Sequence, residues 1–172
     1  MKDADLKTYI SKVRAGDKEA FSFIYSELKK PVFTVSLRIV GDKPLAEDIT
    51  QEVFVKLFLS PPPSSVKNPR AWIFRIARNL SIDALRKTKS LSIDDAQPQI
   101  ADDSHKIAQK IDLDRAFNNL SVEERQIVSL HLNAALKFSE ISAMMNMSSA
   151  AVYRRYKKAL KTLRDYLEVD VL

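Results

Sequence analysis

The sequence predicts an all-α protein built from two small helical domains, and three observations carry this prediction. Helix-forming residues dominate, and only two glycines occur among the 172 residues. Apolar residues recur at helical spacing, whereas the alternation typical of strands is hard to find. Residues 88–106 are polar, with Ser, Asp, Gln and Pro but no apolar periodicity. We therefore expect an N-terminal domain at residues 1–87, a flexible linker at 88–106 and a C-terminal domain at 107–172.

Glycine, aspartate and proline mark the ends of the expected N-terminal helices. A first helix ends at Gly16, after which Asp17 caps a second helix. Pro31 is expected to bend or restart this helix, which then ends at Gly41. A third helix runs over about residues 44–59, with a proline in its first turn.

Three consecutive prolines follow the third helix and predict a stiff loop over residues 60–67. The next helix runs over about residues 69–87. Its buried stripe is expected to comprise Ile73, Ile76, Ala77, Leu80 and Ala84. Trp72 lies beside this stripe, where it fits either a core position or a platform for a DNA base.

The C-terminal domain is predicted to contain a helix-turn-helix. A helix over residues 122–132 begins with a capping box, in which Ser121 caps the helix and Glu124 reaches back. A short helix over residues 138–145, a turn and a long helix capped by Ser148 follow. In this arrangement the second helix of the motif enters the major groove of DNA.

The final helix has the charge pattern of a DNA-reading surface. Residues 153–164 contain six Lys and Arg residues and no acidic residue, and arginine can contact phosphates or guanine edges. The first turn carries no acid, which leaves the positive end of the helix free for phosphate. The competing interpretation is a solvated basic face on an ordinary helix. The candidate DNA contacts are Ser148, Ser149, Tyr153, Arg154, Arg155 and Lys158.

Composition argues against several other classes of function. The net charge is +6, and a mildly basic protein with clustered positive charge often binds a polyanion. The absence of cysteine excludes disulfides, thiolate zinc sites and cysteine nucleophiles. No catalytic triad or glycine-rich phosphate loop is recognisable, so we expect no enzyme activity and no cofactor. No apolar run reaches the ~18–20 residues that span a membrane, and the N-terminus lacks a signal-peptide core, which predicts a cytoplasmic protein without membrane insertion.

Six segments of the sequence resemble bacterial sigma factors. In the C-terminal half, residues 120–128 (LSVEERQIV), 138–141 (FSEI), 147–148 (MS) and 152–155 (VYRR) resemble their promoter-reading domain. Response-regulator output domains look similar, so the N-terminal half decides between the two. There, residues 46–58 (AEDITQEVFVKLF) resemble the polymerase-binding helix of the extracytoplasmic-function sigma factors. Residues 68–87 (NPRAWIFRIARNLSIDALRK) resemble the helix with which that family meets and helps to melt the −10 element.

The resemblance implies a promoter-recognition subunit that is not itself an enzyme. Core RNA polymerase would bind an acidic and amide ridge formed by Asp48, Gln51 and Glu52. The −10 element would be contacted by Arg75, Arg78, Asn79 and Arg86. The −35 element would be contacted by the final helix, with Arg155 at a base edge and Arg154 at a phosphate. An anti-sigma factor is expected as a third partner, besides core polymerase and promoter DNA.

Three residues depart from the pattern of the family, and the first, Asn146 in place of a common Gly, is tolerable. Lys137 occupies the place of a serine cap, which should cost the first helix of the turn motif ~1 kcal/mol. Tyr153 stands where Lys or Arg is common, and a tyrosine cannot pair bidentately with a base or phosphate. Two alternative functions stay open from the residues alone. One is a helix-turn-helix transcription factor whose N-terminal half binds a partner other than polymerase. The other is a helical adaptor whose basic face keeps it soluble.

Overall fold

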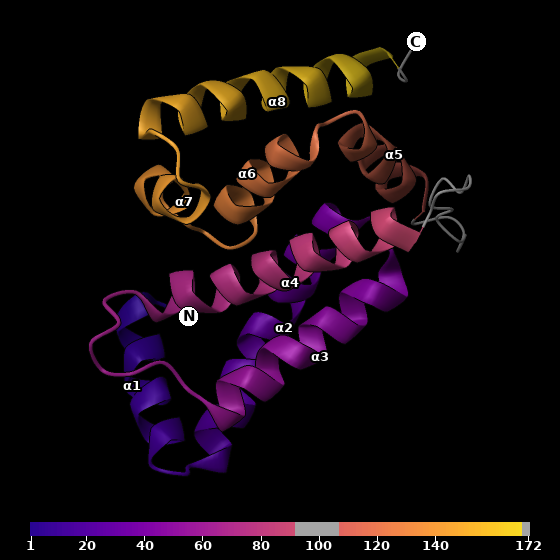
Figure 1. The fold of residues 1–172 in the computed structure, drawn as a ribbon. Helices are drawn as coiled ribbons and strands as arrows, with labels where there is room; N and C mark the ends of the chain where they lie inside the picture. The colour runs from indigo at the N-terminus through magenta and orange to yellow at the C-terminus, as the bar shows by residue number, and fades with distance from the viewer. Residues whose placement is uncertain (92–106, 170–172) are drawn as a thin grey trace.

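The computed structural model describes residues 1–91 and 107–169, and its regular structure there is entirely helical. An N-terminal unit comprises α1 (Asp3–Arg14), α2 (Lys18–Val40), α3 (Lys43–Leu59) and α4 (Pro69–Leu91). A C-terminal unit comprises α5 (Ile107–Asn118), α6 (Val122–Leu132), α7 (Phe138–Met145) and α8 (Ser149–Val169). Figure 1 shows the C-terminal unit lying along α4, with α8 on the far side. The predicted all-α fold class is confirmed.

The helix ends follow the predicted local signals. The carboxylate of Asp17 accepts a hydrogen bond from the Ala20 N–H at 2.9 Å and so caps α2. Gly41 ends the same helix with a φ of 74°, a left-handed conformation that glycine adopts without steric cost. Asn146 ends α7 in the same region, with a φ of 54°. Short-range chemistry therefore fixes where these helices end.

One helix is less interrupted, and another is longer, than the sequence predicted. α2 continues through Pro31 and does not restart there. Proline removes one backbone hydrogen bond, but Val32, Val35 and Ile39 beyond it are fully buried, and we attribute the continuity to their packing. α4 extends to Leu91, four residues into the predicted linker. The remainder of that linker, residues 92–106, lies outside the described residues.

One hydrophobic core joins the two units, with α2 at its centre against α1, α3, α4 and α6. On α4 the fully buried apolar residues are Ile73, Phe74 and Ala77, whereas Ile76, Leu80 and Ala84 of the predicted stripe are half-buried. Trp72 is also half-buried and packs against this core, which favours the core interpretation. A second, smaller core lies between α5, α6 and α8.

Candidate nucleic-acid and protein interfaces

The exposed face of α3 has an acidic first half and an apolar second half. Asp48, Gln51 and Glu52 are all exposed, because the opposite face of the helix is buried in the core. The Glu52 carboxylate lies 3.4 Å from the Lys56 ammonium, and this pair is open to solvent. Beyond it the exposed side chains are apolar: Val55, Phe58 and Leu59 are 54%, 46% and 72% exposed. Exposed apolar side chains beside charged ones are typical of a protein-binding surface.

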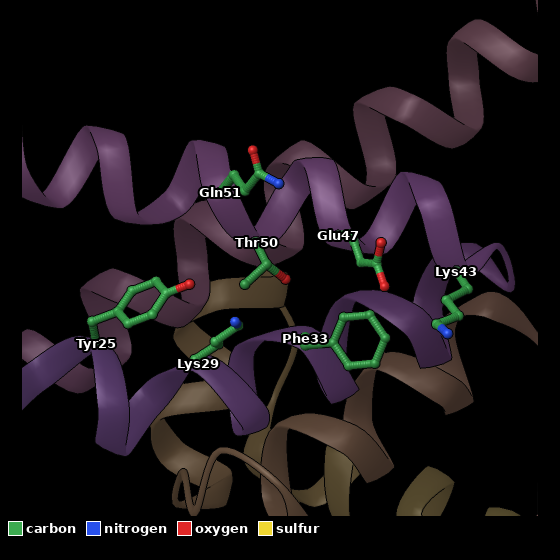
Figure 2. A pocket seen from close by; sticks show the side chains of 7 residues that line it. All are labelled: Tyr25, Lys29, Phe33, Lys43, Glu47, Thr50 and Gln51. Carbon is green, nitrogen blue, oxygen red and sulfur yellow. The ribbon is translucent and has the colours of Figure 1, made fainter.

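A groove of about 390 Å³ lies between α2 and α3 beside this face (Figure 2). Lys29 and Phe33 of α2 face Glu47 and Thr50 of α3 across it. At one end the Lys29 ammonium lies 5.2 Å from the ring centroid of Tyr25, a cation–π contact. The groove was not predicted, because it arises from the packing of two helices and leaves no local pattern in either.

The predicted −10 contacts on α4 differ in exposure. Arg75, Asn79 and Arg86 are exposed. Arg78 is half-buried: its Nε donates to Oε1 of Gln126 on α6 at 2.7 Å, and its Nη1 donates to Oδ1 of Asn79 at 3.1 Å. Burial, and then repulsion by Arg86, lowers the pKa of Arg78 below its usual range. Arg78 is thus held by the C-terminal unit, a contact that the sequence did not predict.

The loop before α4 ends at Asn68, which touches both units. Its Oδ1 accepts a hydrogen bond from the Ala71 N–H at 3.0 Å and so caps α4. Its Nδ2 donates to the carboxylate of Glu140 on α7. This residue therefore links the start of the predicted −10 helix to the first helix of the helix-turn-helix.

The N-terminal end of α8 presents polar and basic side chains to solvent. The Ser148 hydroxyl accepts a hydrogen bond from the Ala151 N–H at 3.1 Å, which confirms the predicted cap. The buried side of the helix contains Val152, Ala159 and Leu163. The exposed candidate contacts are Ser148, Ser149, Tyr153, Arg154 and Lys158, whereas Arg155 is half-buried.

Two basic residues of α8 are paired with the start of α6. The Nε of Arg155 lies 3.0 Å from the Glu123 carboxylate. The Lys158 ammonium lies 3.2 Å from the carboxylate of Glu124, the residue that completes the capping box with Ser121. Arg154 has no ion pair among the described residues, so it is freer than Arg155 to reach DNA.

Tyr153 is fixed by a row of rings although it is 48% exposed. Its ring meets that of Phe138 edge-on, with centroids 5.5 Å apart. Phe138 in turn stacks on His131 at 4.3 Å, and Nδ1 of His131 lies 2.9 Å from the carbonyl oxygen of Leu136. The row therefore holds Tyr153 in a defined position on the outer face of α8.

Comparison with known families covers both units. Residues 24–91 match the family Sigma-70 region 2, and residues 110–163 match Sigma-70, region 4. Individual relatives carry the more specific name: the ECF sigma factor SigM of Bacillus subtilis is 29% identical over 150 residues, which are 81% of this chain and 92% of SigM. This chain belongs to the extracytoplasmic-function sigma factors.

Two further relatives have sequence identities above and below that of SigM. The ECF sigma factor SigW of Bacillus subtilis is 34% identical over 85 residues, which span 49% of this chain and only 46% of SigW. SigK of Mycobacterium tuberculosis is 22% identical over 97% of this chain and 96% of its own. The similarity is therefore highest over a part of the chain and lower over its whole length.

Two solved structures share the fold. RpoE of Bartonella quintana, in complex with the anti-sigma factor NepR, has a TM-score of 0.72 at 20% identity and covers 87% of this chain and 98% of its own. CnrH, in complex with the cytosolic domain of CnrY, has a TM-score of 0.68 at 18% identity and covers 95% and 97%. At these identities the likeness supports the fold alone.

The two matched regions divide the candidate residues of this sigma factor between them. The region 2 match contains α3 and α4, and hence all predicted polymerase and −10 contacts. The region 4 match extends from α5 into α8 and contains all predicted −35 contacts. Sequence reasoning missed the partners of three candidates, namely Gln126 for Arg78, Glu123 for Arg155 and Glu124 for Lys158. In the described part of the chain, the search for membrane-spanning helices finds none of sufficient length and apolarity.

Proposed function

We propose that this sigma factor directs RNA polymerase to promoters, with α3 binding core polymerase, α4 contacting the −10 element and α8 contacting the −35 element. The observation that carries the proposal is that one chain contains both sigma regions, each with most of its predicted contact residues exposed. Arg78 and Arg155 are the half-buried ones. The polymerase supplies the chemistry, so the protein acts as a cytoplasmic specificity subunit without catalysis or a cofactor of its own.

The polymerase-binding surface is proposed to comprise the whole exposed face of α3. Asp48, Gln51 and Glu52 would meet a basic surface of the polymerase, which favours fast and specific association. The apolar second half, from Val55 to Leu59, would add affinity by losing its contact with water. We therefore expect the partner surface to have a basic patch that continues into an apolar one.

On promoter DNA, exposed residues of both units are proposed to make the contacts. Arg75, Asn79 and Arg86 can reach the −10 strand directly, whereas Arg78 must first leave Gln126. On α8, Arg154 is free, and Arg155 must exchange Glu123 for a base edge. Arg155 stays our candidate for base reading, because it matches the position of the family's arginine and can pair bidentately with guanine, and Arg154 stays our candidate for phosphate binding.

An anti-sigma factor is the third partner that we propose. Among the structural neighbours, RpoE was solved with the anti-sigma factor NepR bound, and CnrH with the cytosolic domain of CnrY bound. The exposed face of α3 would suit this partner too, because a protein that covers it would block the polymerase. The alternative function, a helix-turn-helix transcription factor with a different partner, is not favoured, because region 2 is present over residues 24–91.

The direct test is transcription with purified bacterial core polymerase. On sheared genomic DNA of the host, addition of this protein should produce transcripts with defined 5′ ends that core polymerase alone does not make. Unchanged transcript ends with and without the protein would reject the sigma function.

A matched pair of variants tests the role of α3. Asp48→Arg with Glu52→Arg should weaken binding to core polymerase by tenfold or more, about 1.4 kcal/mol or above, while circular dichroism stays unchanged. The control, Asp165→Arg with Glu168→Arg, makes the same charge change at two exposed positions of α8. Equal affinities of the two double variants for core polymerase, in a pull-down without DNA, would show that α3 is not part of the interface.

A further inference from the structure

The outer face of α8 has an exposed apolar spot within a polar and basic surface. Ala150 and Tyr153 are both exposed, and residues three apart on a helix are neighbours on one face. The exposed side chains around them are polar or basic, namely Ser149, Arg154 and Lys157. The apolar spot therefore interrupts a surface that otherwise suits phosphates.

The Tyr153 ring is supported by three other rings. Phe138, which it meets edge-on, also contacts Tyr156, with centroids 5.2 Å apart. His131 stacks on Phe138 and meets Tyr156 edge-on at 4.9 Å. Tyr156 packs against both hydrophobic cores, so the rings are anchored in the interior. A ring that is already held in position loses little conformational freedom when a ligand binds to its exposed part.

The apolar spot lies at the end of α8 that reads bases in a helix-turn-helix. Ser148 caps the helix, so Ala150 and Tyr153 belong to its first two turns. The N-terminal residues of the second helix contact base edges in this motif. The hydroxyl oxygens of Ser149 and of Ser142 on α7 lie 3.1 Å apart, and Figure 1 shows the start of α8 beside α7. The two helices thus hold this end of α8 in place.

Duplex DNA offers one group that matches an apolar spot. In the major groove every base pair presents hydrogen-bonding groups, and thymine alone adds a methyl group, at C5. Phosphates are charged and gain nothing from contact with an apolar side chain. The minor groove is too narrow to admit a helix. The thymine methyl group is therefore the chemical counterpart of the spot formed by Ala150 and Tyr153.

We propose that Tyr153 and Ala150 select a thymine at one position of the −35 element by packing against its C5-methyl group. This inference rests on the proposed function of α8 and adds a base preference to it. Both residues are uncharged, so their contact adds preference for a base without adding attraction to phosphates. Burial of one methyl group corresponds to about fourfold in affinity, and this is the expected size of the preference.

The test removes the methyl group from the DNA and the ring from the protein, separately and together. The probe is a labelled duplex of a promoter whose start site the transcription assay has identified. Each thymine of its −35 element, on either strand, is replaced in turn by deoxyuridine, which pairs in the same way but lacks the methyl group. Fluorescence anisotropy with the holoenzyme should show a loss of about fourfold in affinity at one position. Tyr153→Ala should bind the thymine and deoxyuridine duplexes of that position equally.

Four further variants separate the methyl contact from charge and from loss of folding. Tyr153→Phe keeps the ring and should keep the preference for thymine. Tyr153→Lys should bind both duplexes more tightly, because it adds a positive charge, but should show no preference, which a misfolded protein would not do. Arg154→Ala should weaken both duplexes by the same factor. Ala150→Ser leaves the supporting rings untouched and should reduce the preference. Circular dichroism reports whether each variant is folded.

Three results would overturn the proposal. The wild-type holoenzyme could bind every deoxyuridine duplex as tightly as the thymine duplex, or the −35 element could contain no thymine on either strand. A preference for thymine that survives both Tyr153→Ala and Tyr153→Lys would show that another residue reads the methyl group. In each case defined transcript ends would still establish the sigma function. Without such ends the sigma function itself fails, and this inference fails with it.

Discussion

Glu124 links the cap of α6 to the DNA-reading helix, so its replacement by glutamine should have two measurable consequences. Its carboxylate accepts hydrogen bonds from the backbone N–H and the hydroxyl of Ser121, each at 2.9 Å. It also pairs with the Lys158 ammonium at 3.2 Å. Burial raises the pKa of Glu124, but the bonds from Ser121 and Lys158 outweigh it, and the pKa lies below its ordinary value.

The expected loss of stability follows from these contacts. The hydrogen bonds that the carboxylate accepts from Ser121 complete the capping box and contribute about 1 kcal/mol. The pair with Lys158 adds less than ~1 kcal/mol because the lysine is largely exposed. Glutamine keeps one acceptor oxygen but no charge. Glu124→Gln should therefore lower the free energy of unfolding by about 1–2 kcal/mol at neutral pH. For a protein of this size that is about 2–8 °C in Tm.

The pH dependence gives the sharper test. A carboxyl whose pKa is lower in the folded state stabilises the protein fully above its unfolded-state pKa, and this contribution disappears as the pH falls through the folded-state value. The difference between wild type and Glu124→Gln, measured by urea unfolding, should be constant near pH 7 and shrink below the ordinary value of 4.5. Glu123→Gln is the matched control, since its pair with Arg155 is half-exposed and should contribute less than ~1 kcal/mol. A Glu124→Gln difference that persists unchanged in acid, or is absent at neutral pH, would refute the reasoning.

Three further predictions concern DNA reading and domain organisation. Arg155→Ala should cost about 1–3 kcal/mol on a promoter but much less once its −35 element is scrambled, whereas Arg154→Ala should weaken both templates alike; equal losses for Arg155→Ala would reject base reading. Tyr153→Phe should keep −35 affinity if the ring makes the contact, and Tyr153→Ala should lose it, as a gel-shift assay with holoenzyme can measure; equal losses in both would instead assign the contact to the hydroxyl. Limited proteolysis should cut first between Thr88 and His105, where the polar composition breaks the helical pattern, and the two fragments should co-elute on gel filtration because they share one core; early cleavage within α3 would contradict this domain division.

Local chemistry made most of the helix ends predictable. Asp17, Ser121 and Ser148 each cap the helix they precede, and Gly41 and Asn146 end theirs in the left-handed region. All of these features depend on contacts within a few residues, so a single sequence contains the information. The exposure of the α3 ridge was equally predictable, since helical periodicity alone separates its two faces.

Contacts between distant segments were not predictable in the same way. Phe74 is fully buried although it lies outside the predicted stripe of α4, because α4 packs against three helices of its own unit and bears contacts from the C-terminal unit as well. Arg78 donates a hydrogen bond to Gln126, a residue 48 positions away, and no local sequence pattern predicts that contact. The candidate DNA residues could therefore be named from the sequence, but their state in the free protein could not.

Glu140 compensates for the missing cap at Lys137 and also bonds to the N-terminal unit. A lysine cannot accept a capping hydrogen bond, so α7 lacks the serine-type cap that the family pattern predicts. The backbone N–H of Lys137 instead donates to the Glu140 carboxylate at 2.8 Å, which recovers half of a capping box. The same carboxylate accepts the bond from Asn68. Because the Glu140 carboxylate accepts both bonds, Glu140→Ala should weaken both α7 and its contact with the start of α4, whereas Glu140→Gln, which keeps an acceptor, should weaken each less. Hydrogen exchange of α7 and of the first turn of α4 should therefore become faster together in the alanine variant. Faster exchange of α7 with unchanged exchange of α4 would show that Glu140 stabilises only its own helix.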